Sequence, residues 1–237
     1  MRNYNSVSDE KSRIRGRIQA YSELGMYKEA IRESKELIRL DPGDSSSFIE
    51  LGVSCEENSE TNKAIRYYKH AIKRFPEDSH LYANLGYCYG KYKKRDDMEM
   101  VLCEKALEID PYNEWALNNI GAILARKSKF KESLSYYEKA YEACKYKYSS
   151  VCEHIMHNFA WALYRYGKYA RAWLIYSYLV EEYPDKPHVV CDFGRVSYKM
   201  GMYRKAVDYF GKALAISPDG RHYKRLVRVA YNKVDKK

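Results

Sequence analysis

The sequence predicts an all-α protein, an array of stacked helical hairpins, on the basis of two recurring features. Five of the six prolines close helical-looking segments, and three of the intervals between neighbours are 34 or 35 residues: Pro42, Pro76, Pro111, Pro184 and Pro218. Proline cannot continue a helix and disfavours the α region in the residue before it, so each position marks a helix end. Between the prolines, a small residue flanked by bulky ones recurs at helical spacing. Self-similarity with a period of roughly 20 to 50 residues indicates a repeat architecture.

The recurring pattern is clearest in residues 45–78 and 187–220. The first segment carries Phe48, Leu51, Gly52, Ala64, Tyr68, Ala71 and Pro76, and the second carries Val190, Phe193, Gly194, Ala206, Phe210, Ala213 and Pro218. This pattern resembles the tetratricopeptide repeat (TPR), a helix-turn-helix unit of roughly 34 residues. The resemblance implies a right-handed α-solenoid, in which the first helix of each repeat lines the concave surface.

The same frame places six repeats along the chain. They occupy residues 11–44, 45–78, 79–113, 114–147, 153–186 and 187–220, and the third repeat has one extra residue. Residues 148–152 exceed the repeat length, and Lys145 stands where a closing proline belongs, so we expect one irregular joint there. We also expect a flexible leader at 1–10 and a basic capping helix at 221–237 with Val227 and Tyr231 on its inner face, because the exposed end of a repeat array needs a polar-faced cap.

The composition narrows the class of protein. The 237 residues include 42 Lys and Arg against 32 Asp and Glu, a formal charge of +10, and at 46% hydrophobic the chain is too apolar for intrinsic disorder. No apolar run approaches the roughly 20 residues that a bilayer crossing requires. The first 17 residues contain no apolar signal region, so we expect a cytoplasmic protein without membrane association. The six cysteines are scattered along helical segments, which favours reduced thiols over a disulfide framework.

Three asparagines are candidates for binding a peptide backbone. In TPR arrays the sixth position of the repeat points into the concave groove, and in the third to fifth repeats that position holds Asn84, Asn119 and Asn158. Each side-chain amide can both donate to and accept from an extended peptide, so the resemblance predicts a peptide-holding ladder. The alternative is that these asparagines bond to a neighbouring helix.

A row of basic residues is the second candidate feature. The thirteenth position of the repeat is basic in five successive units, spaced 35, 39, 34 and 34 residues apart: Lys91, Arg126, Arg165, Lys199 and Lys233. These intervals follow the insertions that the apolar pattern places independently, and Arg195 adds charge near the C-terminal end. Potential of one sign focused in a concavity attracts an oppositely charged ligand, so we predict a basic groove. The alternative is an ordinary solvated face.

Two aromatic residues complete the predicted groove. The repeat frame directs Tyr87 and Trp161 into it, as it does Tyr164 and Tyr198. Trp161 is the best anchor for a ligand, because an amphipathic ring at the centre of an interface contributes strongly to binding. The alternative is that Trp161 packs on its neighbours.

Metal binding and catalysis are disfavoured. The densest set of ligand-type side chains lies on two adjacent first helices: His154, His157, His188 and Cys191. Side chains three apart share a helix face, so a zinc site is an alternative, but histidine also fills the same repeat position at His80 and His222. The sequence has no Cys-x-x-Cys pair, no Gly-rich phosphate loop after a strand and no nucleophile elbow. We therefore expect no metal, no cofactor, no catalytic residues and no enzymatic activity.

These features predict a non-enzymatic adaptor or scaffold that binds an extended, acidic protein segment in the concave groove of repeats three to six. Two alternatives remain open. The basic C-terminal end is also typical of an RNA-binding or other polyanion-binding array. A basic cap that docks on the acidic first repeats of the next molecule would instead produce a self-assembling scaffold.

Overall fold

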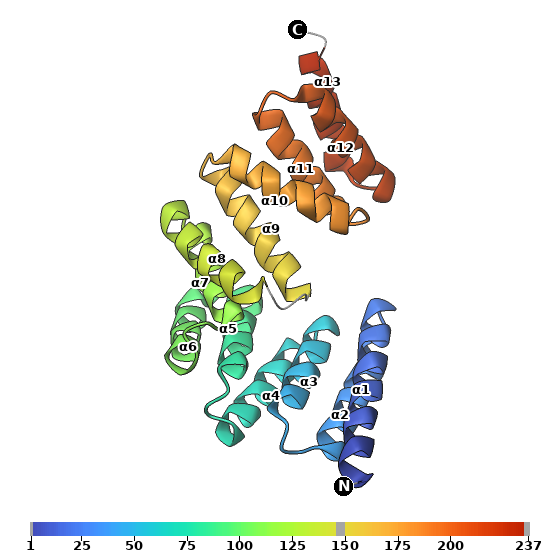
Figure 1. Ribbon diagram of the computed structural model, residues 1–237, viewed down its shortest axis with the longest axis vertical. Coiled ribbons are helices and arrows are strands. Elements are labelled where there is room, and N and C mark those ends of the chain that lie inside the picture. Colours follow the sequence, from blue (N-terminus) through green and yellow to red (C-terminus); the bar gives the residue numbers. More distant parts are fainter. Residues whose placement is uncertain (1, 146–149, 235–237) are drawn as a thin grey trace. The chain divides into compact units, whose positions relative to one another are not determined.

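The computed structural model describes residues 2–145 and 150–234, with side chains described for residues 7–145 and 152–234. Every regular element in these residues is an α-helix (Figure 1). The described helices are α1 (Arg2–Glu23), α2 (Tyr27–Leu40), α3 (Ser45–Glu57), α4 (Thr61–Arg74), α5 (Ser79–Lys93), α6 (Asp96–Ile109), α7 (Glu114–Arg126), α8 (Phe130–Cys144), α9 (Ser150–Arg165), α10 (Tyr169–Glu182), α11 (Pro187–Lys199), α12 (Tyr203–Ile216) and α13 (Arg221–Val234). The predicted all-α helical-repeat solenoid is confirmed, and the described helices fit six hairpins followed by a terminal helix.

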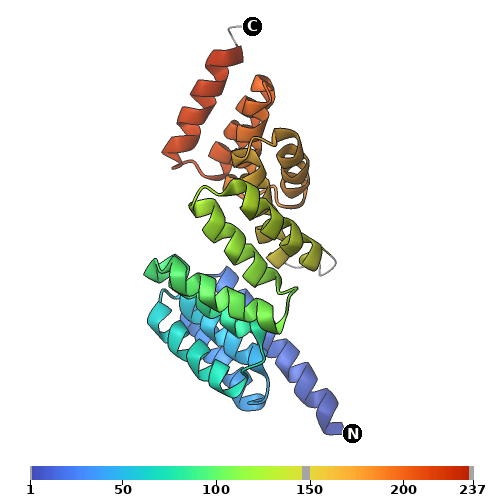
Figure 2. The same cartoon turned by 90° about the vertical axis from the view of Figure 1, so that its left-hand side faces the viewer.

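Helices that are neighbours in the sequence pack against each other (Figure 2). The hairpins include α1 with α2, α3 with α4, α5 with α6, α9 with α10 and α11 with α12. Second helices also pack on the first helix of the next repeat, as α2 does on α3 and α10 does on α11. Each hairpin therefore shares its core with the next one, because a single hairpin cannot bury its apolar face alone.

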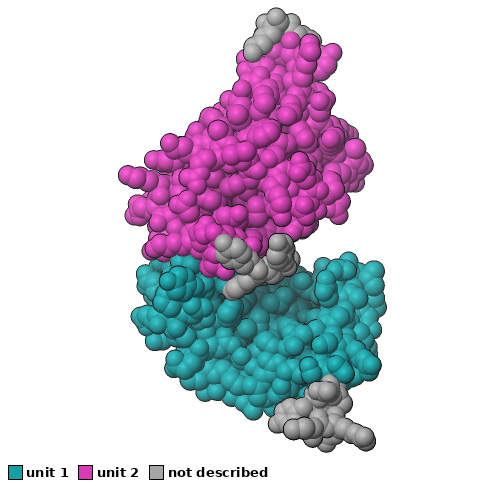
Figure 3. All heavy atoms as spheres, viewed as in Figure 1, with its two compact units in different colours: residues 1–120 teal, residues 121–237 magenta. Residues whose placement is uncertain are grey.

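The chain divides into two compact units, Met1–Ile120 and Gly121–Lys237, and the boundary falls inside α7 (Figure 3). The first unit has a core around Leu51 and Tyr68, and the second has one around Tyr176 and Phe193. All four of these side chains are 2% exposed or less.

The small residue of the repeat lets the two helices of a hairpin approach closely. A Cβ atom added at Gly52 in α3 would lie 2.2 Å from the ring of Tyr68 in α4. A Cβ atom at Gly194 in α11 would lie 2.7 Å from the ring of Phe210 in α12. Both distances are well below van der Waals contact, so the packing of these aromatic rings depends on glycine.

Two aspartates are the N-cap residues of first helices in the first unit. Asp44 precedes α3 and accepts a hydrogen bond from Ser46 N, and Asp78 precedes α5 and accepts one from His80 N. A side chain that accepts from an early helical N–H satisfies a donor that the helix leaves unpaired. Because each aspartate follows a helix-ending turn by a few residues, the local sequence determines both the end of one repeat and the start of the next.

The N-terminal end differs from the expected flexible leader at residues 1–10. Helix α1 begins at Arg2 and continues without a break to Glu23. No proline or glycine interrupts residues 2–15, and Glu10 lies 3.6 Å from Arg13 in a pair three residues apart. Such pairs on one face stabilise a helix, which extends the first helix beyond the repeat frame.

The expected irregular joint lies between α8 and α9, and residues 146–149 are outside the described part of the chain. Helix α8 has 15 residues, whereas the second helices α2, α4, α10 and α12 have 14. Helix α9 has 16 residues, whereas the first helices α3 and α11 have 13. Part of the insertion therefore lengthens the flanking helices. The thiols of Cys144 and Cys152 face each other here, with the Sγ atoms 2.7 Å apart.

The C-terminal helix packs on its predecessor as a cap. Helix α13 buries Tyr223 and Ala230 against α12, while Tyr231, which we expected on the inner face, is 54% exposed. Within the described residues, no helix combines the length and the apolar character that a membrane crossing requires.

Candidate ligand-binding site

The predicted asparagine ladder is partly engaged within the fold. Asn84 Nδ2 donates to His80 O in its own helix over 2.8 Å, and Asn119 Nδ2 donates to Ala83 O in α5 over 3.3 Å. Asn119 is only 3% exposed, so it bonds to a neighbouring helix, as the alternative interpretation expected. Asn158 is half-buried on α9. A peptide-holding role for the three residues remains a prediction.

In the first unit, Lys91 lies close to two tyrosine rings at the C-terminal end of α5. Its Nζ atom is 4.9 Å from the ring centroid of Tyr87 and 5.0 Å from that of Tyr92. The two rings meet edge to face, with centroids 6.2 Å apart. An ammonium group near aromatic faces is held by cation–π attraction while it remains exposed to ligand.

In the second unit, Arg165 and Trp161 form a comparable arrangement on α9. The Cζ atom of Arg165 is 4.9 Å from the Trp161 ring centroid and 4.8 Å from that of Phe130. Trp161 and Phe130 contact each other edge to face at 6.1 Å. Trp161 therefore packs on its neighbours with one part of its surface and stays half-buried.

The remaining members of the predicted basic row are exposed near helix ends. Arg126 lies at the end of α7, and Lys233 lies near the end of α13. Both side chains are exposed. Lys91 belongs to the first unit and the other four members belong to the second, so the row is divided between the units.

Two of the predicted basic residues converge on a pocket in the second unit. Arg195 and Lys199 of α11 line a pocket of about 270 Å³ together with Tyr164 of α9 and Leu226 and Val229 of α13. The helices α9, α11 and α13 all occupy the first-helix place in their repeats. The structure therefore brings Tyr164 and Lys199, which the repeat frame directed into the groove, together with apolar side chains of α13.

A second hollow shares Arg195 and Leu226 with this pocket and extends its positive charge. It has a volume of about 430 Å³ and includes Arg221 and Arg225 of α13. We call the two hollows together the basic pocket, with the cations Arg195, Lys199, Arg221 and Arg225.

Most of the charge in the basic pocket is available to a ligand. Arg195 Nη1 lies 3.3 Å from Asp192 Oδ1. No carboxylate in the described residues pairs with Lys199, Arg221 or Arg225, and all three side chains are exposed. The pocket therefore carries excess positive charge over an apolar lining.

Sequence reasoning missed part of this pocket. Arg221 and Leu226 were not among the predicted site residues, although Arg221 and Arg225 are four residues apart and share a helix face. The spacing of Arg221 and Arg225 could therefore have identified a basic face on this helix. The sequence did not reveal that α13 turns this face towards α11.

The histidine group forms a polar contact beside the basic pocket. His157 Nε2 lies 3.2 Å from Asp192 Oδ2, and its ring centroid is 5.2 Å from that of His188. Burial lowers the pKa of His188, and the neighbouring His157 lowers it further. His154 is exposed and Cys191 is buried. In the part of the chain that the structure describes, no group of three or more His, Cys, Asp or Glu residues is arranged to hold a metal ion.

The stacked hairpins define a helical-repeat protein. Two family models, each described as tetratricopeptide repeat, match the chain, one over residues 112–176 and the other over 19–44, 79–113 and 188–219. The chain belongs to the tetratricopeptide repeat family.

Solved structures show the same fold. The chain is similar to one in the APC/C hetero-tetramer Cut9-Hcn1, with a TM-score of 0.79 and 17% identity, over 96% of this chain and 46% of that one. It therefore spans about half the length of that relative. It is also similar to Pseudomonas aeruginosa pilF (TM-score 0.66, 18% identity, 81% of this chain and 86% of that one). A third similar structure is that of YrrB, described as a TPR protein with an unusual peptide-binding site (TM-score 0.56, 20% identity, 84% and 97%).

Proposed function

We propose that this protein is a non-enzymatic adaptor that binds an extended, acidic segment of a partner protein through the basic pocket. The tetratricopeptide repeat fold implies a protein-interaction scaffold, and the acidic character of the bound segment is the further step. The observation that carries it is the cluster of Arg195, Lys199, Arg221 and Arg225 around an apolar and aromatic lining.

The chemistry of the basic pocket suits carboxylates. Guanidinium groups bind carboxylates through two parallel hydrogen bonds, which fix orientation as well as adding affinity. Leu226 and Val229 exclude water from one side of the pocket, and a lower local dielectric strengthens charge attraction. Tyr164 adds a rigid amphipathic contact surface at a small cost in conformational entropy.

The other predicted groove residues are proposed as further ligand contacts on the first helices, each within its own unit. In the first unit they are Asn84, Tyr87, Lys91 and Asn119, and in the second unit they are Arg126, Asn158, Trp161, Arg165 and Lys233. Support comes from the position of these residues in the repeat and from YrrB, a protein of this fold that is described as having a peptide-binding site. A cytoplasmic location also belongs to the proposal, since scattered cysteines in helical segments are typical of reduced thiols.

A direct test uses a fluorescent glutamate-rich peptide and a glutamine-rich peptide of the same length. We expect the glutamate peptide to bind more tightly. The double variant Arg221→Glu, Arg225→Glu should weaken its binding about tenfold or more, which corresponds to about 1.4 kcal/mol. The matched control is Lys224→Glu, Arg228→Glu, which makes the same change of charge on exposed positions of the same helix outside the pocket.

The outcomes separate the rival functions. Equal loss with both double variants would mean that general charge, not the basic pocket, attracts the peptide. A single-stranded RNA of equal length that binds more tightly than the peptide, with a steep loss of affinity as salt rises, would favour the polyanion-binding alternative. Self-association that the Arg221→Glu, Arg225→Glu variant abolishes would favour the self-assembling scaffold.

A further inference from the structure

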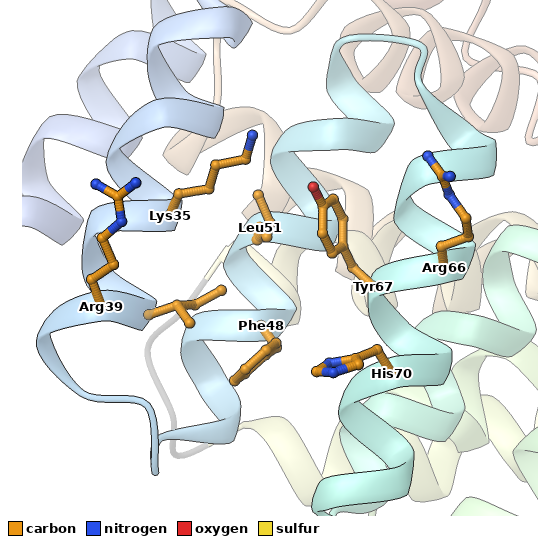
Figure 4. A pocket seen from close by; sticks show the side chains of 8 residues that line it. Lys35, Arg39, Phe48, Leu51, Arg66, Tyr67 and His70 are labelled. Carbon is orange, nitrogen blue, oxygen red and sulfur yellow. The ribbon is translucent and has the colours of Figure 1, made fainter.

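A second pocket lies in the first unit, between the second helices α2 and α4 (Figure 4). Its volume is about 520 Å³. Phe48 and Leu51 of α3 form its floor, and Tyr67 of α4 lines one side. Ile38 of α2 also lines the pocket. We call it the outer pocket, since it is formed mainly by second helices, whereas the basic pocket is formed mainly by first helices.

The outer pocket exists because two second helices share one first helix. Both α2 and α4 pack on α3, and the gap between them is closed at the bottom by well-packed side chains. Phe48 is 5% exposed and Leu51 is 2% exposed. Phe48 is held from behind by Phe75, with ring centroids 5.7 Å apart. The side chains of the floor are therefore well packed, and the space above them is a preformed apolar hollow.

Cations stand on both sides of this hollow. Lys35 and Arg39 project from α2, and Arg66 projects from α4 on the opposite side (Figure 4). No carboxylate in the described residues pairs with Lys35 or Arg66. Arg39 Nη1 pairs with Glu36 Oε1 at 2.5 Å, but both side chains are exposed, and exposed pairs contribute little. The rim therefore carries positive charge that is available to an anionic partner.

The corresponding place in the second unit has a different chemistry. Between α8 and α10, over α9, lies a hollow of about 680 Å³. Its lining includes Glu182, Lys145 and the buried Glu153. Lys145 pairs with Glu142, and Glu153 pairs with Lys186. A cationic rim is thus not a general property of the gap between second helices, and its presence between α2 and α4 calls for a specific explanation.

We propose that the outer pocket is a docking site for a partner peptide that carries one bulky apolar side chain flanked by acidic residues. A pocket of a few hundred cubic ångströms with an apolar floor suits one large side chain. A peptide without acidic residues would leave the rim cations facing apolar surface, at a desolvation cost. An acidic peptide without an apolar anchor would leave the floor unfilled. This site is independent of the basic pocket, because it lies on other helices of the other unit.

The experiment uses a short peptide with one photoreactive benzoylphenylalanine flanked on both sides by glutamates. Cross-linking to the full chain followed by mass spectrometry locates the anchor. We expect cross-links in α2, α3 and α4, and we expect a peptide with alanine in place of the aromatic residue to bind about tenfold more weakly. Cross-links confined to α9, α11 and α13 would overturn the outer pocket while supporting the basic pocket.

Matched variants test the rim. The double variant Lys35→Glu, Arg66→Glu should remove most cross-linking in α2, α3 and α4 and weaken binding there about tenfold. The control Lys28→Glu, Lys73→Glu places the same charges on exposed positions of the same two helices outside the pocket. Equal effects of the two double variants would overturn the proposal. So would tight, rim-dependent binding of a fatty acid that displaces the peptide, since the occupant would then be an amphiphile.

Discussion

The first and second units each present a cationic pocket, but they build it from different helices of the same repeat. In the second unit the cations come from α11 and α13, both in the first-helix place. In the first unit they come from the second helices α2 and α4. One repeat therefore offers two chemically independent surfaces, and the side-chain charge at each place decides which of them can bind an anionic partner.

The cores of the two units differ in a related way. Tyr68 and Tyr176 occupy the same position of their repeats, and both are buried. Tyr68 Oη donates to Glu56 Oε1 over 2.9 Å, whereas the hydroxyl of Tyr176 has no hydrogen-bond partner in the described residues. Within the described residues, the hydroxyl of this buried tyrosine is therefore hydrogen-bonded in the first unit and unpaired in the second.

The largest expected effect concerns the close approach on which the first unit depends. Gly52→Ala should lower the free energy of unfolding by about 1 to 3 kcal/mol, because the added Cβ would overlap the ring of Tyr68. Gly211→Ala is the control: its Cβ meets nothing within 4 Å in α12, and alanine in a helix should add about 0.5 to 1 kcal/mol. Denaturant unfolding followed by circular dichroism measures both. Equal stability of the two variants would contradict the overlap.

The second prediction sharpens the contrast between the two tyrosines. Tyr68→Phe should cost about 1 to 3 kcal/mol, since it removes the hydroxyl that donates to the buried Glu56 carboxyl. Tyr176→Phe should leave stability unchanged or raise it by up to about 1 kcal/mol, since it removes an unpaired buried hydroxyl. The two variants delete the same atom, so their difference in unfolding midpoint isolates the hydrogen bond. Similar losses in both would show that Tyr176 has a partner.

The third prediction tests whether the outer pocket and the basic pocket bind peptide independently of each other. The probe is a glutamate peptide with one aromatic residue. Each double variant should weaken its binding at the mutated pocket about tenfold, or about 1.4 kcal/mol, and leave binding at the other pocket unchanged. Combining Lys35→Glu, Arg66→Glu with Arg221→Glu, Arg225→Glu should give additive losses, as expected for sites that share no residues. Titration calorimetry provides both stoichiometry and affinity. A single binding event removed by either pair would mean that the pockets act as one site.

The smallest expected effect concerns the negative charge of Asp44, which precedes α3 and pairs with Lys11 and Arg15 of α1. Burial raises the pKa of Asp44, but the hydrogen bonds from Lys11 and Ser46 and the charge of Lys11 together outweigh burial, so the pKa lies well below its ordinary value of 3.8. Asp44 Oδ2 also lies 2.9 Å from Arg15 Nη2. A carboxyl with a lowered pKa stabilises the fold above its unfolded-state pKa, and this stability is lost as the pH falls below about 4.

Asp44→Asn should therefore cost about 1 kcal/mol at neutral pH, and the difference from the parent protein should shrink as the solution becomes acidic. Asparagine keeps the helix cap, so the variant isolates the charge. The control is Asp97→Asn, at an exposed aspartate whose pKa is lowered to about 2 by Arg95. Thermal unfolding across the pH range is the measurement. A constant difference between Asp44→Asn and the parent protein at all pH values would exclude the charge as the cause.

The fold was predictable because its determinants are local and recurrent. Proline spacing marked the helix ends, and glycines such as Gly52 and Gly194 marked the close crossings with Tyr68 and Phe210. Because each repeat contacts its immediate neighbours, a periodic sequence determines a periodic structure. Arg195 and Lys199, which the periodicity placed on one first helix, line one pocket in the structure. The long α1 departed from the frame because no proline or glycine interrupts residues 2–15, so the helix continues past the repeat boundary.

Only the tertiary structure decided which side chains are available. Asn84 and Asn119 occupy equivalent repeat positions, yet one bonds to its own helix and the other reaches into α5. The outer pocket depends on the width of the gap between α2 and α4, and the basic pocket depends on the face that α13 turns towards α11. Gap widths and side-chain partners arise from packing between elements, which the periodicity of a single sequence does not encode. The sequence by itself therefore determined the repeat, its helices and the charge carried at each position, while packing decided where that charge surrounds a cavity.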